Sequence, residues 1–300
     1  MLLREVIELY DILDDPSAAA AKVKDMFLKE APEFVTLRTE KAGGTEFIRI
    51  SVPALSGGVP TLGIIGRLGG VGARPAVLGF VSDGDGALSV LAAALKAVRM
   101  AERGERFPVN LLFVTHIDPD APVRPHKPVP FMGSCISSAE CNRYELDPCM
   151  DLVISVDTTK GNRVVNHTGI AVTPTVKDGV ILPVSGTLLD IASFVTGEAP
   201  YVLPLSQQDI TPYANQLYHI NSIMQPAVAT SAPVVGLAIT SSSVVPGCAS
   251  GASRYEDVEA AARFLIETAK RAAEDDIFYD KKEYRRFIEL YGDGNKRFQA

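Results

Sequence analysis

A strongly apolar segment that stops at two carboxylates set among glycines most constrains the fold of this chain. Residues 76–81 read Ala-Val-Leu-Gly-Phe-Val, and Ser-Asp-Gly-Asp-Gly follows at 82–86. Leucines then recur at helical spacing from Leu88 onward, with alanines between them. The pattern predicts a buried strand, a tight turn that carries Asp83 and Asp85, and a helix. In an open α/β sheet, such a turn lies at the carboxyl edge of the strands, where ligands bind.

Two further apolar segments also deliver carboxylates. One leads into His116 and Asp118, and the other leads into Asp157. We therefore expect Asp83, Asp118 and Asp157 to meet at one edge of the sheet. Three crowded carboxylates repel one another unless a cation lies between them, and oxygen ligands suit Mg²⁺, Mn²⁺ or Ca²⁺. The alternative is that each aspartate only caps the turn or helix that follows it.

The rest of the chain alternates strand-like and helix-like segments. Strands are expected at 34–38, 46–52, 61–66, 111–115, 152–156, 169–176, 201–205 and 234–240. Helices are expected at 2–13, 17–30, 84–103, 186–195 and 213–224, and a long one is expected after a capping box of Ser253 and Glu256.

Strand–helix alternation without a repeat or a linker predicts one α/β domain over residues 1–300. The expected architecture has three layers: a mixed, mostly parallel sheet with helices on both faces. Residues 1–33 would form N-terminal helices, and residues 278–300 a charged, aromatic C-terminal tail.

Composition limits the partners. The net charge of −7 and the absence of a basic stripe argue against nucleic acid. Four cysteines without C-x₂-C spacing are typical of reduced thiols in a cytoplasmic protein. The amino-terminal segment lacks the pattern of a signal peptide, and no apolar run reaches the length of about 18 residues expected of a membrane span.

Arg67 opens a glycine-rich loop at 66–72. A guanidinium among three aspartates would neutralise them by bidentate pairing and leave a pocket for the carboxylate of a small peptide or amino acid. The alternative is a surface arginine on a loop. The loop lacks the G-x-G-x-x-G order of a dinucleotide site.

His116 and Asp118 are two residues apart, so on a strand they point to the same side. His116 is a candidate general base or replacement metal ligand, and Asp85 is a second candidate for moving the proton. A structural histidine at a strand end is the alternative.

Two candidates for substrate contact lie further along the chain. Cys248 precedes a helix, whose N-terminus lowers the pKa of a thiol, and it could pair with His116 for metal-free hydrolysis. An inert buried thiol is the alternative. Asp209 follows the strand at 201–205 and is either a substrate contact or a helix N-cap.

The order Asp83, Asp118, Asp157 across residues 60–270 resembles the two-zinc exopeptidases, the aminopeptidases and their relatives. The resemblance implies a peptidase-like fold, with Asp83 as the bridging carboxylate. It also implies that Asp118 and Asp157 are metal ligands, that Asp209 lies near the substrate, and that the chain assembles into a homo-oligomer.

The chain departs from that pattern at three places. The usual His-x-Asp slot reads Arg67-Leu-Gly, the general-base slot is Ile117, and the late-histidine slot at 240–244 has no histidine, Cys248 being the nearest metal-competent side chain. The chain also resembles a bacterial and archaeal family of unknown function that is similar to these peptidases.

Two functions therefore compete. The first is metal-assisted amide hydrolysis of a small peptide or amino-acid derivative, with Mn, Mg or Zn held by Asp83, Asp118 and Asp157. The second is a non-catalytic relative that binds such a molecule through Arg67.

Overall fold

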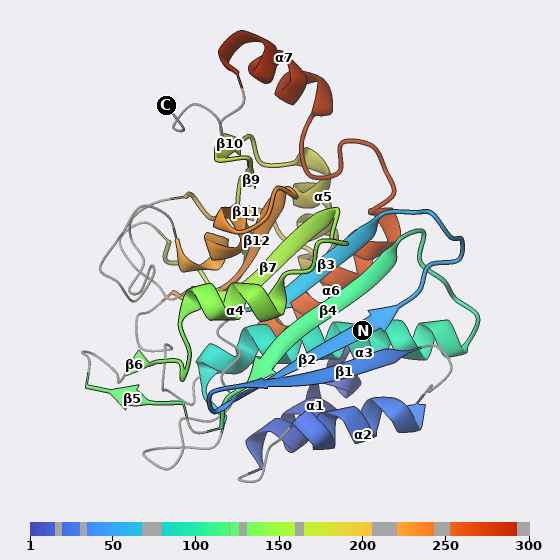
Figure 1. The fold of residues 1–300 in the computed structure, drawn as a ribbon, viewed down its shortest axis with the longest axis vertical. Helices are drawn as coiled ribbons and strands as arrows, with labels where there is room; N and C mark the ends of the chain where they lie inside the picture. The colour runs from blue at the N-terminus through green and yellow to red at the C-terminus, as the bar shows by residue number, and fades with distance from the viewer. Residues whose placement is uncertain are drawn as a thin grey trace.

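The computed structural model describes residues 1–15, 20–30, 35–67, 80–119, 121–125, 131–159, 165–205, 221–242 and 253–292. Its centre is a mixed ten-stranded sheet with helices on both faces (Figure 1), as the sequence predicts. The strands of this sheet are β1 (Thr36–Ala42), β2 (Thr45–Val52), β3 (Thr61–Gly66), β4 (Asn110–Ile117), β7 (Leu152–Thr159), β8 (Gly169–Val172), β9 (Thr175–Lys177), β10 (Val180–Leu182), β11 (Tyr201–Val202) and β12 (Val234–Thr240). A separate hairpin joins β5 (Val123–Arg124) and β6 (Phe131–Met132).

Four neighbouring strands at the centre of the sheet run parallel. The order is β1-β2-β4-β3-β7-β12-β8-β11, with β9 paired to β12 and β10 to β9. Strands β4, β3, β7 and β12 are mutually parallel, whereas β2, β8 and β9 run antiparallel to their central neighbours. The four central strands therefore end at one edge, which is where an open α/β sheet places ligands.

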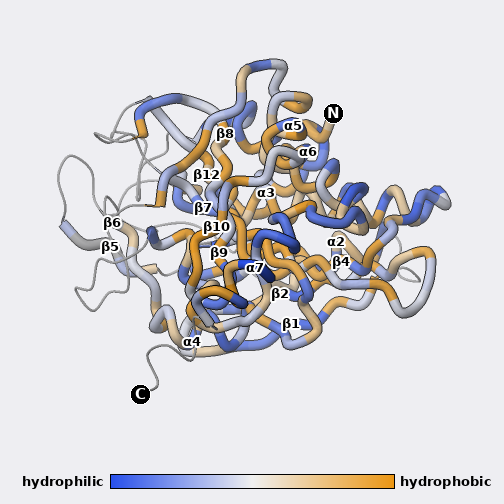
Figure 2. Tube along the Cα trace, turned by 90° about the horizontal axis from the view of Figure 1, so that it is seen from above, coloured by the Kyte–Doolittle hydropathy of each residue, from blue (hydrophilic) through white to orange (hydrophobic). Residues whose placement is uncertain are grey.

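The helices divide unevenly between the two faces. Five of the described helices cover one face: α1 (Leu3–Asp14), α2 (Ala20–Glu30), α3 (Asp85–Glu102), α5 (Gly186–Thr196) and α6 (Tyr255–Arg271). The other face carries α4 (Ser138–Glu145) and the 3₁₀ helix η2 (Ser222–Val228). Helix α7 (Lys281–Tyr291) projects from the top of the molecule (Figure 1). Figure 2 shows hydrophobic segments along the central strands and α3, and a largely hydrophilic α7.

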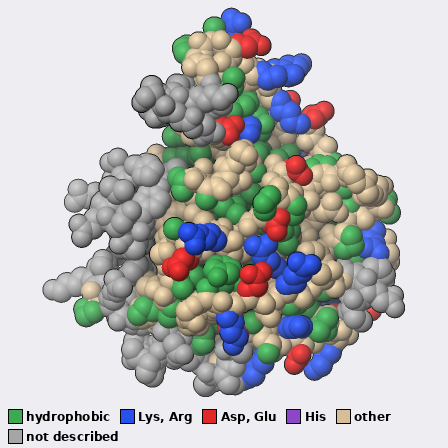
Figure 3. Space-filling model, in the orientation of Figure 1, with side chains coloured by type: hydrophobic (Ala, Val, Ile, Leu, Met, Phe, Trp, Pro, Cys, Tyr) green, Lys and Arg blue, Asp and Glu red, His purple; other side chains and the backbone are tan. Residues whose placement is uncertain are grey.

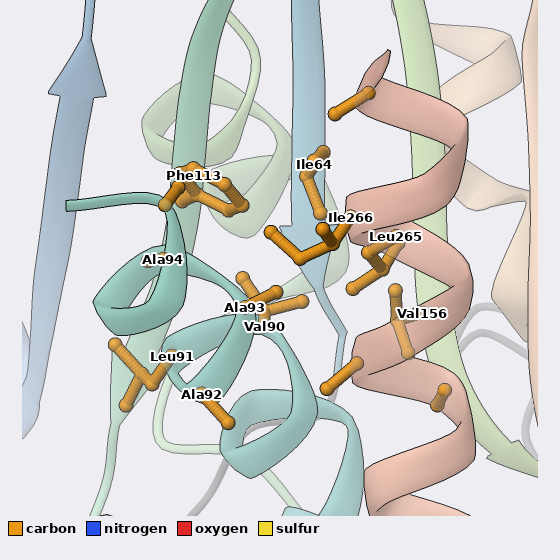
Figure 4. Packing of buried hydrophobic residues seen from close by; sticks show 14 of the residues in the cluster. Ile64, Val90, Leu91, Ala92, Ala93, Ala94, Phe113, Val156, Leu265 and Ile266 are labelled. Atoms are coloured by element: carbon orange, nitrogen blue, oxygen red, sulfur yellow. The ribbon is translucent and has the colours of Figure 1, made fainter. Parts of the chain in front are cut away.

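The two cores follow from the alternation of side chains along each strand. On β4, Leu111 and Phe113 face the five-helix side, and Leu112 and Val114 face the other. In the larger core, strand residues such as Ile64 lie against α3 and α6 (Figure 4).

Small residues let α3 approach the sheet closely. Alanines fill much of its buried surface, and the first turn of α3 lies directly on β7. A Cβ at Gly86 would lie 2.8 Å from the carbonyl oxygen of Val156, which is a backbone atom that cannot swing aside. Glycine is therefore required at this contact.

The structure corrects several expected boundaries. Phe80 and Val81 are not in a strand, residues 76–79 lie outside the described ranges, and the 3₁₀ turn η1 (Ser82–Gly84) precedes α3. The strand expected at 169–176 is two strands, because Pro174 lacks the N–H that a continuous ladder needs. Only 201–202 of the strand expected at 201–205 forms. Of the helix expected at 213–224, the described end is η2, which contains Pro226.

The expected capping box at the start of α6 does not form. The helix begins at Tyr255, and Arg254 at the N-cap position contributes no side-chain hydrogen bond. The hydroxyl of Ser253 instead donates to Oδ1 of Asp85 at 2.6 Å. The carboxylate of Asp85 is charged, so the hydrogen bond that it accepts from Ser253 is stronger than one that a backbone N–H of the helix would donate to the same hydroxyl.

Asp257, in the first turn of α6, predicts a pH-dependent stability. Burial raises its pKa to about 6, although Nε of Arg254 lies 3.3 Å from its carboxylate. An acid whose folded pKa exceeds its unfolded value stabilises the fold at low pH and loses that contribution as the pH rises. We expect Asp257→Asn to remove a fall in stability between about pH 4 and 6 and to be about 1–2 kcal/mol more stable than the wild type at pH 7.

Urea unfolding at pH 4, 5, 6 and 7 measures this effect. The matched control is Glu256→Gln, one residue away and exposed. Parallel pH profiles for the wild type and Asp257→Asn would contradict the expectation.

The segment expected to be a charged, aromatic tail contains a helix. This helix is α7, of which no residue is buried. Among the described helices, none has both the length and the apolar character needed to span a bilayer.

Candidate functional site

Buried polar residues gather at the carboxyl edge of the central strands, on the face covered by α4 and η2. Arg67 directly follows β3, His116 lies near the end of β4, and Asp157 lies in β7. All three are buried, and so is Glu145 at the end of α4. We call Arg67, His116, Glu145 and Asp157 the carboxyl-edge cluster. Asp118 lies two residues after His116, just beyond the end of β4.

Arg67 ties β3 to both covering elements. Its Nη1 donates to Oδ1 of Asn142 at 3.0 Å and pairs with Oε2 of Glu145, and its Nη2 donates to Oε1 of Gln225 at 2.6 Å. Burial lowers the pKa of the guanidinium, but Glu145 and other neighbours more than compensate and raise it. Arg67 is only 3% exposed, so it is not a surface arginine.

Arg67 therefore pairs with Glu145 and not, as expected, with three aspartates. Its direct ionic partner is Glu145, and Asp157 contributes to the local field without a direct bond to the guanidinium among the described contacts. The reason is that α4 runs across the sheet edge and brings a carboxylate closer than the strand ends do.

Glu145 also holds His116. Its Oε1 lies 3.0 Å from Nδ1 of the imidazole. Burial alone would raise the pKa of Glu145, but Arg67 and the hydrogen bond from His116 outweigh burial and lower it. An ionised carboxylate on Nδ1 favours the tautomer in which Nδ1 carries the proton and Nε2 the lone pair.

The imidazole of His116 is also fixed by packing. The ring of Phe47 lies against it, with 5.4 Å between centroids, and the ring of Tyr144 stacks on Phe47 with 4.8 Å between centroids. Within the parts of the chain that the structure describes, Nε2 has no hydrogen bond. His116 thus has a held ring and one ring nitrogen available for proton transfer.

The predicted carboxylates each have partners of their own. Asp118 accepts from Oγ1 of Thr45 at 3.2 Å, and from the backbone N–H and thiol of Cys135 at 3.1 and 3.2 Å. Asp157 accepts from the backbone N–H of Thr158 at 2.7 Å and from Ser222 at 3.3 Å.

The other two predicted carboxylates lie where α3 begins, Asp83 in the preceding η1 and Asp85 as the first residue of the helix. Asp83 is buried in η1. Asp85 accepts a hydrogen bond from Ser253 beside α6, and its charge raises the pKa of Tyr10 on α1. Its described interactions are therefore with the five-helix face and not with His116. No described contact joins Asp85 to the carboxyl-edge cluster, and its role as a proton carrier stays a prediction.

The described side chains at this edge do not by themselves form a two-metal centre. Over the described ranges, no three or more His, Cys, Asp or Glu side chains are grouped so that they could hold a metal ion. Glu145 is already paired with a guanidinium, and Nδ1 of His116 is committed to Glu145. The positive charge of the cluster is supplied by Arg67. The assignment of Asp83, Asp118 and Asp157 as metal ligands stays a prediction.

Sequence reasoning missed Glu145, Asn142 and Gln225. A usable signal existed for the first two, because Ser137 and Glu140 form a capping box that starts α4. Asn142 and Glu145 are three residues apart and so share one face of that helix. Gln225 lies in a short 3₁₀ helix and had no such signal.

The remaining predicted site residues can be placed only in part. Asp209 and Cys248 lie outside the described residues, as does the loop after Arg67. Of the described cysteines, Cys141 lies beside the cluster, and burial, reinforced by Glu145, raises the pKa of its thiol to about 12, which favours the protonated thiol at neutral pH.

Comparison with known proteins agrees with the fold. Residues 36–300 match the sequence model of a family described as "Protein of unknown function (DUF1177)". No curated protein sequence matches the chain.

Solved structures resemble it at low identity. A tomato leucine aminopeptidase variant superposes with a TM-score of 0.52 at 11% identity, over 89% of this chain and 61% of that one. The Porphyromonas gingivalis glutaminyl cyclase gives a TM-score of 0.52 at 11% identity, over 89% of this chain and 95% of that one. A Caenorhabditis elegans leucine aminopeptidase gives a TM-score of 0.52 at 12% identity, over 89% of this chain and 65% of that one.

This chain spans less than two thirds of the length of these two aminopeptidases. At these identities the likeness shows the fold, and it confirms the expected aminopeptidase-like α/β architecture.

Proposed function

From the premise that the chain belongs to the DUF1177 family of proteins of unknown function, we propose that it hydrolyses an amide bond in a small peptide or amino-acid derivative. His116 is the general base. The observation that carries the proposal is the contact of Glu145 with Nδ1 of His116, which leaves Nε2 to take a proton.

The proposed reaction uses the held imidazole twice. Nε2 of His116 takes a proton from a water molecule as the water oxygen bonds to the carbonyl carbon of the amide. Glu145 stabilises the imidazolium that forms, and Arg67 keeps Glu145 ionised. When the carbon–nitrogen bond breaks, His116 returns the proton to the leaving amine.

A binding role through Arg67 finds less support. Its Nη1 and Nη2 atoms already donate to Glu145, Asn142 and Gln225, so a ligand carboxylate would have to displace a protein partner. The reaction proposed above routes no step through a metal ion, because the possible donors in the described ranges do not group into a metal site.

The experiment assays the purified chain against dipeptides and N-acyl amino acids, after chelation and after loading with Mn²⁺, Mg²⁺ or Zn²⁺. We expect hydrolysis that survives chelation. His116→Gln is expected to lower kcat/KM by about 10²-fold or more, the usual contribution of a general base. The matched control is His167→Gln, because His167 stacks on Tyr201 and has no described contact with the cluster.

Three results would contradict the proposal. An unchanged kcat/KM in His116→Gln would show that His116 is not the general base. Hydrolysis that is lost on chelation and kept in His116→Gln would favour the predicted metal site instead. Saturable binding without turnover, abolished in Arg67→Ala, would favour a binding protein.

A further inference from the structure

Arg49, on β2, contacts the end of α4 on both sides of Glu145. Its Nη2 donates to the carbonyl oxygen of Tyr144 at 2.6 Å and to that of Leu146 at 3.2 Å. Its Nη1 donates to Oδ2 of Asp147 at 2.9 Å. One guanidinium therefore binds the backbone immediately before and immediately after the residue whose carboxylate joins the carboxyl-edge cluster.

These hydrogen bonds satisfy acceptors that the helix itself leaves open. The last carbonyl groups of an α-helix have no N–H partner within the helix, and its C-terminal end carries a partial negative charge. A guanidinium suits both features, because it is always charged and presents several donors in one fixed plane. Only 15% of the Arg49 side chain is exposed, so water competes weakly for these bonds.

Helix α4 needs such contacts because its own sequence does little to stabilise it. It has eight residues, most of them polar, and helices this short are marginal in isolation. Figure 3 shows acidic and basic side chains next to one another on the face of the molecule that carries α4. The position of Glu145 is therefore set by what binds the two ends of the helix. Ser137 caps the first end, and Arg49 binds the second.

The neighbouring position on β2 supports the same contact. Phe47 and Arg49 are two residues apart on a strand, so both side chains point toward the face that α4 covers. The ring of Phe47 lies 4.8 Å from that of Tyr144 and 5.4 Å from that of His116, measured between centroids. Strand β2 therefore contacts both the imidazole and the helix end that carries its carboxylate partner.

We propose that Arg49 is the positioning residue of the carboxyl-edge cluster. It binds the carbonyls of Tyr144 and Leu146 and thereby fixes the backbone of Glu145. Oε1 of Glu145 then stays against Nδ1 of His116, which keeps the imidazole proton on Nδ1 and the lone pair on Nε2. The consequence for catalysis rests on the function proposed above, whereas the tautomer of the imidazole does not.

Nitrogen NMR of the isotope-labelled full chain tests the proposal without an assay of activity. Spectra are recorded at alkaline pH, where imidazole is neutral. We expect His116 in the wild type to be protonated on Nδ1, and Arg49→Gln to give a mixture of the two neutral tautomers. His116→Gln identifies the signals of this histidine.

A conservative variant guards against simple misfolding. Circular dichroism checks that each variant is folded, and Arg49→Lys decides the question if Arg49→Gln is not. Lysine keeps the charge but offers one nitrogen for two carbonyls and a carboxylate, so Arg49→Lys is expected to give a mixture intermediate between the wild type and Arg49→Gln.

Two control variants make the test specific to the carbonyl contacts. Arg38→Gln removes the exposed arginine directly opposite Arg49 on β1 and is expected to keep the wild-type tautomer. Asp147→Asn removes the ion pair but leaves both carbonyl bonds, and it is also expected to keep the wild-type tautomer.

Kinetics give a second readout on any amide that the wild type hydrolyses. We expect Arg49→Gln to lower kcat by about 10-fold or more and to leave KM nearly unchanged, because a displaced base acts poorly on a substrate that still binds. A wild type that hydrolyses no amide but shows the expected tautomers would contradict the proposed function and support the positioning role.

Three spectroscopic results would overturn the proposal. The first is an Arg49→Gln tautomer identical to that of the wild type. The second is a wild type in which Nε2 of His116 carries the proton, because Glu145 would then not select the tautomer. The third is an equal mixture of tautomers in Asp147→Asn and Arg49→Gln, which would assign the positioning role to the carboxylate of Asp147.

Discussion

Glu145→Gln is expected to lower the free energy of unfolding by about 3–5 kcal/mol, the usual effect of breaking a buried ion pair from one side. The substitution leaves the Arg67 guanidinium without its counter-charge at a position that is 3% exposed. It also replaces the anionic acceptor on Nδ1 of His116 by a neutral one. Urea unfolding at pH 7, followed by circular dichroism, measures the change.

A double-mutant cycle separates the ion pair from simple packing. Because removing both charges leaves no uncompensated ion, Glu145→Gln/Arg67→Met is expected to recover part of the stability lost in Glu145→Gln. Arg143→Gln, on the exposed side of the same helix, is the matched control. Additive losses in the double variant would show that the two charges do not interact.

The second large effect is expected at Arg99, which joins α3 to α1 and α2. Its guanidinium forms two hydrogen bonds with Glu30, at 2.7 and 2.9 Å, and also reaches Glu8 at 2.6 Å and Glu5 at 3.2 Å. Replacing it by methionine leaves three carboxylates facing one another around a buried side chain. We expect a loss of about 3 kcal/mol at pH 7, at the lower end of the range because Glu8 and Glu30 are partly exposed.

The pH dependence gives this prediction its signature. Burial raises the pKa of Glu8 but its arginine partners lower it overall, and the hydrogen bonds from Arg99 lower the pKa of Glu30. A carboxyl with a lowered folded pKa contributes stability above its unfolded pKa and loses it as the pH falls through the folded value.

The difference between the wild type and Arg99→Met should therefore be widest near pH 7 and narrow below about pH 4. Urea unfolding from pH 3 to 7 tests this, with Arg103→Gln at the exposed end of α3 as the control. A difference that stays constant with pH would mean that packing, not charge, dominates at Arg99.

The central strands and their helices were predictable because their signal is local. The boundaries of β3 and β12 agree with the sequence prediction, since continuous apolar runs bounded by polar or turn residues are typical of buried parallel strands. The helices α3 and α6 were expected from apolar residues at helical spacing. The start of α6 was misread because Ser253 bonds to Asp85, 168 positions away, and no local pattern reports such a partner.

Of the candidate site, only the residues at the ends of strands were predictable from the sequence. Arg67, His116, Asp118 and Asp157 could be assigned to one edge because strand ends meet there. Glu145 is 78 positions from Arg67 and sits on a short, mostly polar helix with little apolar periodicity. Glu145 becomes the partner of Arg67 because the tertiary structure brings α4 to the end of β3. The sequence around Glu145 does not predict this contact.

The span of the Arg67 contacts also bears on the kinetics of folding. Arg67 meets Gln225 across 158 positions and Glu145 across 78, so the cluster cannot close until most of the chain is in place. Contacts that form after the transition state mainly speed unfolding when they are lost, and we expect the Arg67 contacts to be of this kind. On this expectation, the buried Arg67 determines how slowly the folded protein unfolds and has little effect on how fast it folds.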